Sequence, residues 1–365
     1  MLKIFCSPSR YVQGRDATAE LGSQLAHVGL SGPAYIVASE RISDLLGTTW
    51  RDSLGSAGID HVVGGFGGEC SADEIDRGTA DAREAGAKVI IGAGGGKALD
   101  TARAVAANLA LPVVNCPTLA SSDAPCSALS VIYTPDGEFE QLRFYPRNPE
   151  LVLVDTSLVA AAGRRYLVSG MGDALATWFE ARTVIWAHKP NQVHGGTTLT
   201  GGALAELCYR TLLAEGALAA QAVDAGVVTP ALDHVVEANT LLSGLGFESG
   251  GLAIAHSVHN GLTTAPGTHG YLHGEKVAFG LLVQLIVEGR PAAELAEVAD
   301  FCRTVGLPTT LAQIGVDVKD RAALELVAER TLAPGETAHN EPFELTPEMI
   351  LDGIVAADAY GSATS

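Results

Sequence analysis

The sequence lacks several features that mark common classes of protein. No run of about 18 consecutive apolar residues occurs, so we expect no transmembrane helix. The first residues, MLKIFCSPSRYVQG, contain no long apolar segment, so we expect no secretory signal peptide. The six cysteines include no C-x-x-C pair. They therefore predict buried reduced thiols rather than a zinc knuckle or a disulfide framework.

Basic residues are scarce relative to acidic ones. The 23 Lys and Arg residues stand against 42 Asp and Glu residues, which gives a formal net charge of −19. This charge opposes binding to nucleic acid or to an anionic membrane surface and favours a cytoplasmic protein. The content of 47% hydrophobic and 18% charged residues is typical of a globular protein, and 365 residues suffice for two domains.

Apolar strand-like segments alternate with amphipathic helical segments in the first part of the chain. The strand-like segments are residues 34–39, 59–66, 87–94, 111–117 and 150–155. Their continuous apolar character predicts a parallel sheet with helices on both faces. The polar segment SALSVIYTPDGEFEQLRFY, between the last two strands, predicts a hairpin with its turn at PDGE.

From about residue 160 onward the apolar residues recur with the period of a helix, and no segment shows convincing strand alternation. We therefore predict two domains of different class. Residues 1–160 form an α/β domain with a Rossmann-like parallel sheet, and residues 161–365 form an all-α domain. We expect the two to leave a cleft between them.

Residues 92–101, GAGGGKALDT, lie between the strand-like AKVII and a helical segment. They match neither the P-loop pattern nor G-x-G-x-x-G, which would place a glycine at Lys97. Gly94, Gly95 and Gly96 nevertheless allow a tight turn and the close approach of a ligand. The N-terminus of the following helix favours negative charge. We favour a phosphate site here over an incidental glycine-rich turn.

Four of the ten histidines lie close together, at His256, His259, His269 and His273. The first two are three residues apart and share a helix face, whereas the last two lie in a segment rich in Gly and Pro. The cluster alone fits a metal site and structural histidines equally well. Asp173, in GMGDA, is a candidate carboxylate ligand, although its place at an expected helix start favours an N-cap.

The loop CPTLASSDAPCSALSVIY follows the strand at 111–117, so it reaches the same sheet edge as the glycine loop. Its hydroxyl groups could contact a cofactor, and Asp123 could contact a polar substrate. An ordinary polar loop is the alternative, but loops of this length more often have a function.

These segments together resemble the metal-dependent polyol dehydrogenases related to iron-containing alcohol dehydrogenases, and the glycerol dehydrogenases in particular. The resemblance extends over nearly the whole chain and is densest in GAGGGKALDTARAVA, PTLASSDAPCSALSVIY, RNPELVLVDT, GMGDALATWFEA, FESGGLAIAHSVHNGLT and HGEKVAFG. It implies a dehydroquinate synthase-like fold and a homo-oligomer, commonly an octamer. It also implies that glycerol, or a related vicinal diol, is interconverted with dihydroxyacetone, or the hydroxyketone, by hydride transfer to NAD.

The resemblance also implies a metal site made of one Asp and two His, which carry over to Asp173, His256 and His273. This replaces the N-cap interpretation of Asp173 and leaves His259 and His269 outside the direct ligands. The metal is usually zinc in glycerol dehydrogenases, and iron is the alternative.

The cofactor residues are likewise implied by the resemblance. The pyrophosphate of NAD is expected on Gly94–Lys97, with Asp100 close by. The rest of the cofactor is expected to lie against Thr118, Ser121, Ser127, Leu129 and Tyr133. Asp123 corresponds to the acid that contacts the substrate, and Phe247 is a candidate wall of the polyol pocket. No dedicated general base is evident, and our hypothesis for the proton is a path past His256 or Asp123, the two candidate catalytic residues.

One position departs from the family pattern. Members that prefer NAD have an Asp where this chain has Ser39, and a serine does not repel a 2′-phosphate. Arg41 could attract one, so NADP stays an alternative to NAD. The alternative activities are a glycerol-1-phosphate dehydrogenase and another polyol or alcohol dehydrogenase that uses NADP. A phosphate-bearing substrate calls for a basic pocket, and the segments that flank the predicted ligands are poor in Lys and Arg, with Lys276 as the main exception. A non-catalytic metal- or nucleotide-binding protein is the third and least favoured interpretation.

Overall fold

The computed structural model describes residues 1–135 and 137–363. The chain forms two compact units. The first consists of Met1–Cys6, Arg164–Gln221 and Leu242–Ser365, and the second consists of Ser7–Gly163 and Ala222–Leu241. The domain limits at 1–160 and 161–365, and a cleft between the domains, remain predictions.

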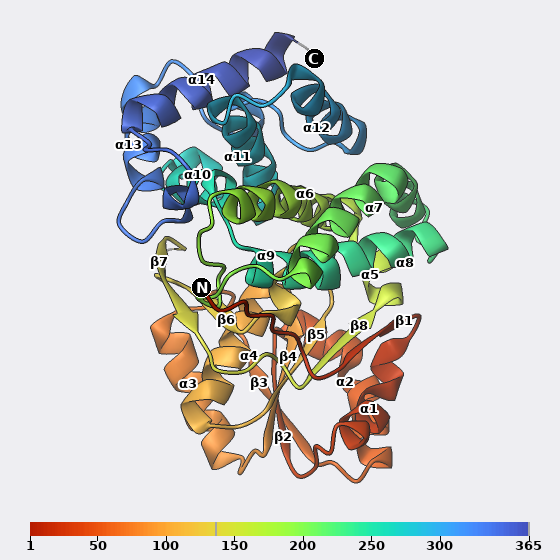
Figure 1. Ribbon diagram of the computed structural model, residues 1–365. Helices are drawn as coiled ribbons and strands as arrows, with labels where there is room; N and C mark the ends of the chain where they lie inside the picture. The colour runs from red at the N-terminus through yellow and green to blue at the C-terminus, as the bar shows by residue number, and fades with distance from the viewer. Residues whose placement is uncertain (136, 364–365) are drawn as a thin grey trace. The chain divides into compact units, whose positions relative to one another are not determined.

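The second unit is built on a six-stranded sheet in which every pair of neighbouring strands is parallel. The strand order is β1-β8-β5-β4-β2-β3 (Figure 1). The strands are β1 (Tyr11–Gly14), β2 (Ala34–Ala38), β3 (His61–Gly65), β4 (Val89–Gly94), β5 (Val113–Pro117) and β8 (Leu151–Asp155). The sequence predicted all of these except the short β1.

Helices cover both faces of this sheet, as predicted. The helices of the unit are α1 (Leu21–His27), α2 (Glu40–Ser56), α3 (Ala72–Glu84), α4 (Gly96–Leu109), α5 (Thr156–Ala162) and α8 (Pro230–Glu237). Ile36 of β2 packs in a core with residues of α1 and α2, whereas the next residue, Val37, packs with residues of α3 and α4. Successive strand residues point to opposite faces, so a continuous apolar strand buries both.

The predicted hairpin between β5 and β8 is confirmed. Its strands β6 (Leu129–Tyr133) and β7 (Phe139–Phe144) pair antiparallel. The expected turn at PDGE includes residue 136, which lies outside the described residues.

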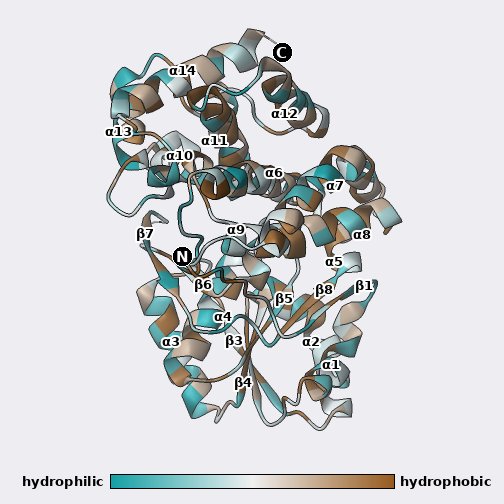
Figure 2. Cartoon of the chain, in the orientation of Figure 1, coloured by the Kyte–Doolittle hydropathy of each residue, from teal (hydrophilic) through white to brown (hydrophobic). Residues whose placement is uncertain are grey.

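The first unit is helical, as the periodicity predicted. Its helices are α6 (Arg164–Trp186), α7 (Leu199–Asp224), α9 (Ser243–Gly250), α10 (Ile254–Leu262), α11 (His273–Val287), α12 (Ala292–Val305), α13 (Arg321–Thr331) and α14 (Pro347–Ala363). An isolated bridge joins Lys3 to Gly196, but the described residues after Asp155 contain no strand. Apolar residues concentrate on the central strands of the sheet and on α11 (Figure 2).

The described residues contain no candidate membrane helix, and the cysteines are reduced. Within the described residues, no helix has both the length and the apolar character needed to cross a membrane. All six cysteines are described and none forms a disulfide; five are buried and Cys6 is half-buried.

Candidate functional site

Two glycines bring α6 and α11 into close contact. A Cβ atom on Gly274 would overlap the carbonyl oxygen of Ser169, and one on Gly172 would overlap the carbonyl oxygen of Gly274. Only glycine therefore lets the start of α11 lie this close to the middle of α6. Each glycine is next to a predicted ligand, so the contact sets His273 beside Asp173. Asp173 lies inside α6 rather than at a helix start, so the N-cap interpretation is wrong.

A third helix reaches the same point. A Cβ atom on Gly280 of α11 would overlap the carbonyl oxygen of Ala255, so α10 also packs closely against α11. His256 projects from the first turn of α10. Its Nε2 atom lies 3.2 Å from Oδ1 of Asp173, and Nε2 of His273 lies 3.1 Å from the same oxygen.

Asp173, His256 and His273 together could hold a metal ion. Each offers one ligand atom, and the three atoms lie within 4.8 Å of one another. The Asp173 side chain is fully buried, whereas the side chain of His256 is 12% exposed and that of His273 is 34% exposed. One carboxylate and two imidazoles suit zinc or iron and leave coordination positions for other groups. The donor set, its spacing and its partial exposure therefore all fit a catalytic metal.

The charges of Asp173 and of the two candidate ligand histidines favour one another's ionised forms. Burial by itself raises the pKa of Asp173, but His273 and His256 outweigh it and hold the pKa well below its ordinary value. Burial lowers the pKa of His256, but the carboxylates of Glu180 and Asp173 outweigh it and raise that pKa well above its ordinary value. The site thus keeps an anion buried against two imidazoles.

The two other histidines of the cluster lie in different surroundings. His259 is buried, and its Nε2 atom lies 3.0 Å from Nδ1 of His273. Burial, followed by the charges of His273 and Lys276, lowers the pKa of His259 well below its ordinary value. His269 is exposed, and its Nε2 atom lies 3.0 Å from the carbonyl oxygen of Thr263. The structure therefore brings His259, but not His269, against the triad.

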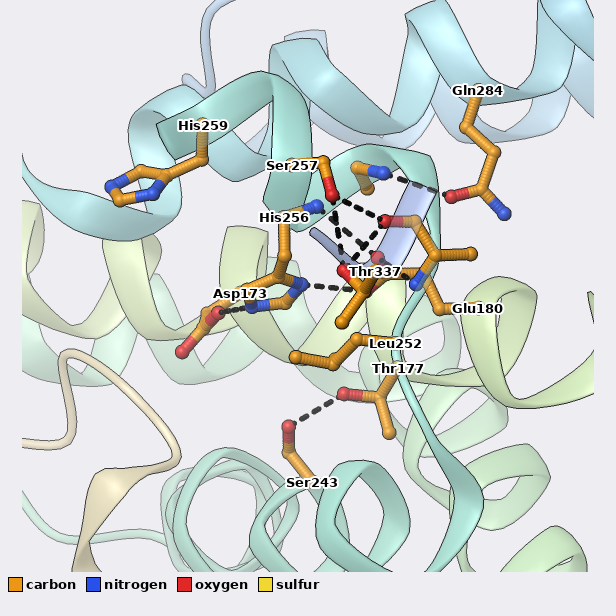
Figure 3. A network of polar contacts seen from close by, with 12 residues as sticks. Asp173, Thr177, Glu180, Ser243, Leu252, His256, Ser257, His259, Gln284 and Thr337 are labelled. Carbon is orange, nitrogen blue, oxygen red and sulfur yellow. Dashed lines mark hydrogen bonds and ion pairs between the residues drawn. The ribbon is translucent and has the colours of Figure 1, made fainter. Parts of the chain in front are cut away.

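Glu180 is a buried residue of the site that the sequence analysis missed. Its Oε2 atom lies 2.6 Å from Nδ1 of His256, on the side of the ring opposite Asp173 (Figure 3). Glu180 and Asp173 are seven residues apart on α6, which places both carboxylates on one face of that helix. This spacing is the signal in the sequence that could have identified Glu180.

The glycine loop forms a second candidate site, in the sheet unit. β4 ends at Gly94, and α4 begins at Gly96 without a side-chain cap. A Cβ atom on Gly95 would lie 3.2 Å from Cδ1 of Leu119, and one on Gly96 would lie 3.3 Å from Oγ of Ser122. The hydroxyl of Thr118 is buried and has no hydrogen-bond partner among the described residues. The uncapped helix start and this hydroxyl fit an anionic ligand such as a phosphate.

The glycine loop lies where the chain reverses the direction in which it crosses the sheet. The chain passes from β2 to the edge strand β3 with α2 on one face, then returns across β2 to β4 with α3 on the other face. Ligands of open α/β sheets bind at the carboxyl ends of the strands at such a point. Ser39 directly follows β2 and precedes α2, so Ser39 and the glycine loop lie at the carboxyl ends of neighbouring strands.

Asp100 and Ser127 are engaged inside the protein. Asp100 is buried, forms an ion pair with Arg103, and accepts a hydrogen bond of 3.0 Å from the backbone N–H of Val131. Arg103 also donates to Oγ of Ser127 at 3.1 Å. These contacts join α4, the helix that follows the glycine loop, to β6 and to the segment just before β6.

Lys97 of the glycine loop contacts an acidic and an aromatic side chain. Lys97 forms an ion pair of 2.6 Å with Glu69, and its ammonium lies 5.3 Å from the centre of the Tyr133 ring.

The remaining predicted residues differ in burial. Leu129 is buried and Ser121 is half-buried. Asp123 is buried just before a short 3-10 helix, Ala124–Cys126. Phe247 is buried in α9 of the helical unit.

Comparison with known proteins places the chain in a family. The model of the family described as iron-containing alcohol dehydrogenase matches residues 8–156. A glycerol dehydrogenase of Thermotoga maritima is 51% identical over 362 residues, which is 99% of this chain and 98% of that protein. A glycolaldehyde reductase of Halobacterium salinarum is 49% identical over 361 residues, which is 99% of this chain and 98% of that protein.

Solved structures agree with these relatives. The crystal structure of a probable glycerol dehydrogenase from Sinorhizobium meliloti 1021 matches with a TM-score of 0.93 and 42% identity, and the match covers 99% of each chain. This likeness confirms the predicted fold class. The chain is an oxidoreductase that belongs to the iron-containing alcohol dehydrogenase family.

Proposed function

We propose that this enzyme interconverts glycerol, or a related vicinal diol, with dihydroxyacetone, or the corresponding hydroxyketone, and that it uses NAD and one divalent metal ion. The observation that carries the proposal is the convergence of Asp173, His256 and His273 from three helices. Support comes from relatives named glycerol dehydrogenase at about half identity over the whole chain.

The proposed roles follow from the chemistry of each residue. Asp173, His256 and His273 would hold the metal, most simply zinc. When bound, such an ion polarises an alcohol hydroxyl and lowers its pKa, while the nicotinamide ring accepts a hydride from the carbon. The chain would orient the diol through Asp123, with Phe247 as an apolar wall. His256 or Asp123 would lie on the path of the leaving proton.

The proposed cofactor site is the glycine loop at the carboxyl end of β4. Gly94–Lys97 would take the pyrophosphate, because their uncapped helix start supplies N–H donors and a positive dipole end. Thr118, Ser121, Leu129 and Tyr133 would line the rest of the cofactor, with Asp100 and Ser127 supporting the loop. We keep the homo-oligomer, commonly an octamer, and the cytoplasmic location as predictions.

A second substrate is favoured by one comparison. The relative from Halobacterium salinarum is named glycolaldehyde reductase. Glycolaldehyde and dihydroxyacetone each carry a hydroxyl next to a carbonyl, so both could chelate a metal through two neighbouring oxygens. We therefore define the substrate class as a vicinal diol and its α-hydroxycarbonyl partner, with glycerol as the first choice.

Metal analysis combined with a substrate panel tests the proposal. We expect the purified protein to bind about one zinc ion per chain and to reduce NAD with glycerol. Chelation should lower the rate at least about 100-fold, because the three protein ligands alone do not polarise a hydroxyl. The panel includes 1,2-propanediol, 2,3-butanediol and glycerol-1-phosphate with NAD and NADP, and glycolaldehyde with the reduced cofactors NADH and NADPH. Activity that survives full metal removal, or that requires glycerol-1-phosphate, contradicts the proposal.

The cofactor preference can be shifted at Ser39. We expect Ser39→Asp to lower kcat/KM for NADP at least about tenfold while leaving that for NAD within about threefold. A carboxylate at this position repels a 2′-phosphate and accepts hydrogen bonds from ribose hydroxyls. Steady-state kinetics with both cofactors measures the change, and Thr48→Asp, at an exposed position further along α2, serves as the control. An equal loss with both cofactors would remove Ser39 from the adenosine site.

A further inference from the structure

We propose that Glu180 is a positioning residue that fixes the tautomer and the ring orientation of His256 and thereby sets the affinity of the site for its metal. This inference rests on the proposed function, because it requires that His256 bind a metal through Nε2. The residue lies behind the three ligands, and nothing in the family resemblance pointed to it.

The contacts of Glu180 divide between its two oxygens. Oε2 lies 2.6 Å from Nδ1 of His256. Oε1 accepts hydrogen bonds from the backbone N–H groups of Ala253, at 2.8 Å, and of His256, at 3.1 Å. The side chain is completely buried, so water does not compete for these contacts. One carboxylate therefore holds both the ring of His256 and the backbone that carries it (Figure 3).

The Oε2 contact selects one tautomer. A neutral imidazole carries a proton on one nitrogen only, and a carboxylate oxygen facing Nδ1 can only accept a hydrogen bond. Nδ1 therefore carries a proton that it donates to Glu180. Nε2 lies 3.2 Å from Oδ1 of Asp173, and a ring that loses its Nε2 proton while Nδ1–H stays on Glu180 is the tautomer that can bind a metal through Nε2. Metal-binding histidines commonly donate their second N–H to a carboxylate in this way, and the partner raises metal affinity.

The Oε1 contacts fix the distance between ligands. Ala253 precedes α10 and His256 lies in its first turn, where backbone N–H groups have no partner inside the helix. Glu180 supplies that partner from α6, the helix that also carries Asp173. A single rigid helix thus contributes one ligand and sets the position of another.

Glu180→Gln separates these two functions. The glutamine retains an oxygen for the N–H groups of Ala253 and His256, but it turns an NH₂ group towards Nδ1. The neutral ring then keeps its proton on Nε2, where it blocks metal binding. Glu288→Gln is the matched control. Glu288 also has a buried side chain, but it accepts hydrogen bonds from Thr183 at 2.6 Å and from Gln284 at 2.7 Å. Within the described part of the chain it forms no hydrogen bond or ion pair with a candidate ligand histidine.

We expect Glu180→Gln to weaken zinc binding about 10–100-fold in competition with a chromogenic chelator. Glu288→Gln should stay within about threefold of the wild type. Cobalt-substituted protein gives a second readout, because altered ligation by His256 changes the visible absorption spectrum. Thermal unfolding of the metal-free proteins checks that each variant folds, and Glu180→Asp tests whether a shorter carboxylate restores part of the affinity.

The outcomes separate the inference from the function on which it rests. If the wild type binds zinc and oxidises glycerol but Glu180→Gln binds zinc as tightly as Glu288→Gln, the positioning role is wrong and the function stands. If the wild type binds no metal at this site, the proposed function itself fails. Weaker zinc binding by Glu180→Gln alone, with a changed cobalt spectrum, supports the inference.

Discussion

Asp173→Asn is expected to lower kcat/KM for glycerol oxidation at least about 1,000-fold, the loss that accompanies removal of an electrostatic element from an active site. The aspartate supplies the one negative charge among the three candidate ligands. It is completely buried, so no water replaces it easily. Asparagine has nearly the same size but presents a neutral amide, which is a much weaker ligand for a divalent ion.

The measurement combines activity with metal content. We expect about one zinc ion per wild-type chain and far less in Asp173→Asn after dialysis. Asp352→Asn, an exposed aspartate of α14 in the same unit, should match the wild type in both respects. NADH binding by Asp173→Asn should be unchanged, because the glycine loop belongs to a different unit of the chain. Full metal content and activity within about tenfold of the wild type would refute the ligand assignment.

Gly95→Val is expected to weaken NADH binding at least about 100-fold, which corresponds to about 2.8 kcal/mol. Gly95 has φ −83° and ψ −179°, an extended conformation that any residue adopts, so the backbone is not strained. The new Cβ would lie 3.2 Å from Cδ1 of Leu119, which requires only a small shift. The branched methyl groups would then cover the N–H groups at the start of α4, where we place the pyrophosphate.

Fluorescence titration with NADH measures this effect, and zinc content shows whether the metal site is intact. Gly47→Val is the control, because a Cβ at this position of α2 would meet no atom within 4 Å beyond its own stretch of helix. We expect Gly95→Val to keep its metal and Gly47→Val to keep both metal and cofactor binding. If Gly95→Val bound NADH like the control, the cofactor would have to lie elsewhere.

Much of the fold could be predicted from local patterns in the sequence. Five of the six strands of the sheet and the change to an all-helical chain follow from continuous apolar strands and from helical periodicity. β1 was missed because its four residues are all half-buried, so it carries no apolar run. Asp173 was first interpreted as an N-cap because glycine before a polar residue is common at a helix start. In the structure that glycine instead allows a close contact between two helices.

The candidate site was predicted less completely, for a related reason. Its candidate metal ligands were predicted from the family resemblance, and the shared helix face of His256 and His259 from their spacing. Glu180 shares its helix face with Asp173, but its function depends on a histidine 76 residues further along the chain. Asp100 was expected beside the cofactor, and its ion pair with Arg103 and its hydrogen bond to Val131 were not foreseen.

Most of the order of strands and helices along the chain, and the glycine-rich turn after β4, follow from the sequence alone, because they depend on periodicity and backbone freedom at neighbouring positions. The candidate metal ligands were implied by the family resemblance. The contact between Asp173 and His273, which are 100 residues apart, follows only from the folded structure. That convergence depends on glycines that remove side chains where α6, α10 and α11 meet, and on a buried glutamate that orients His256. These are contacts between distant segments, which local sequence patterns do not encode.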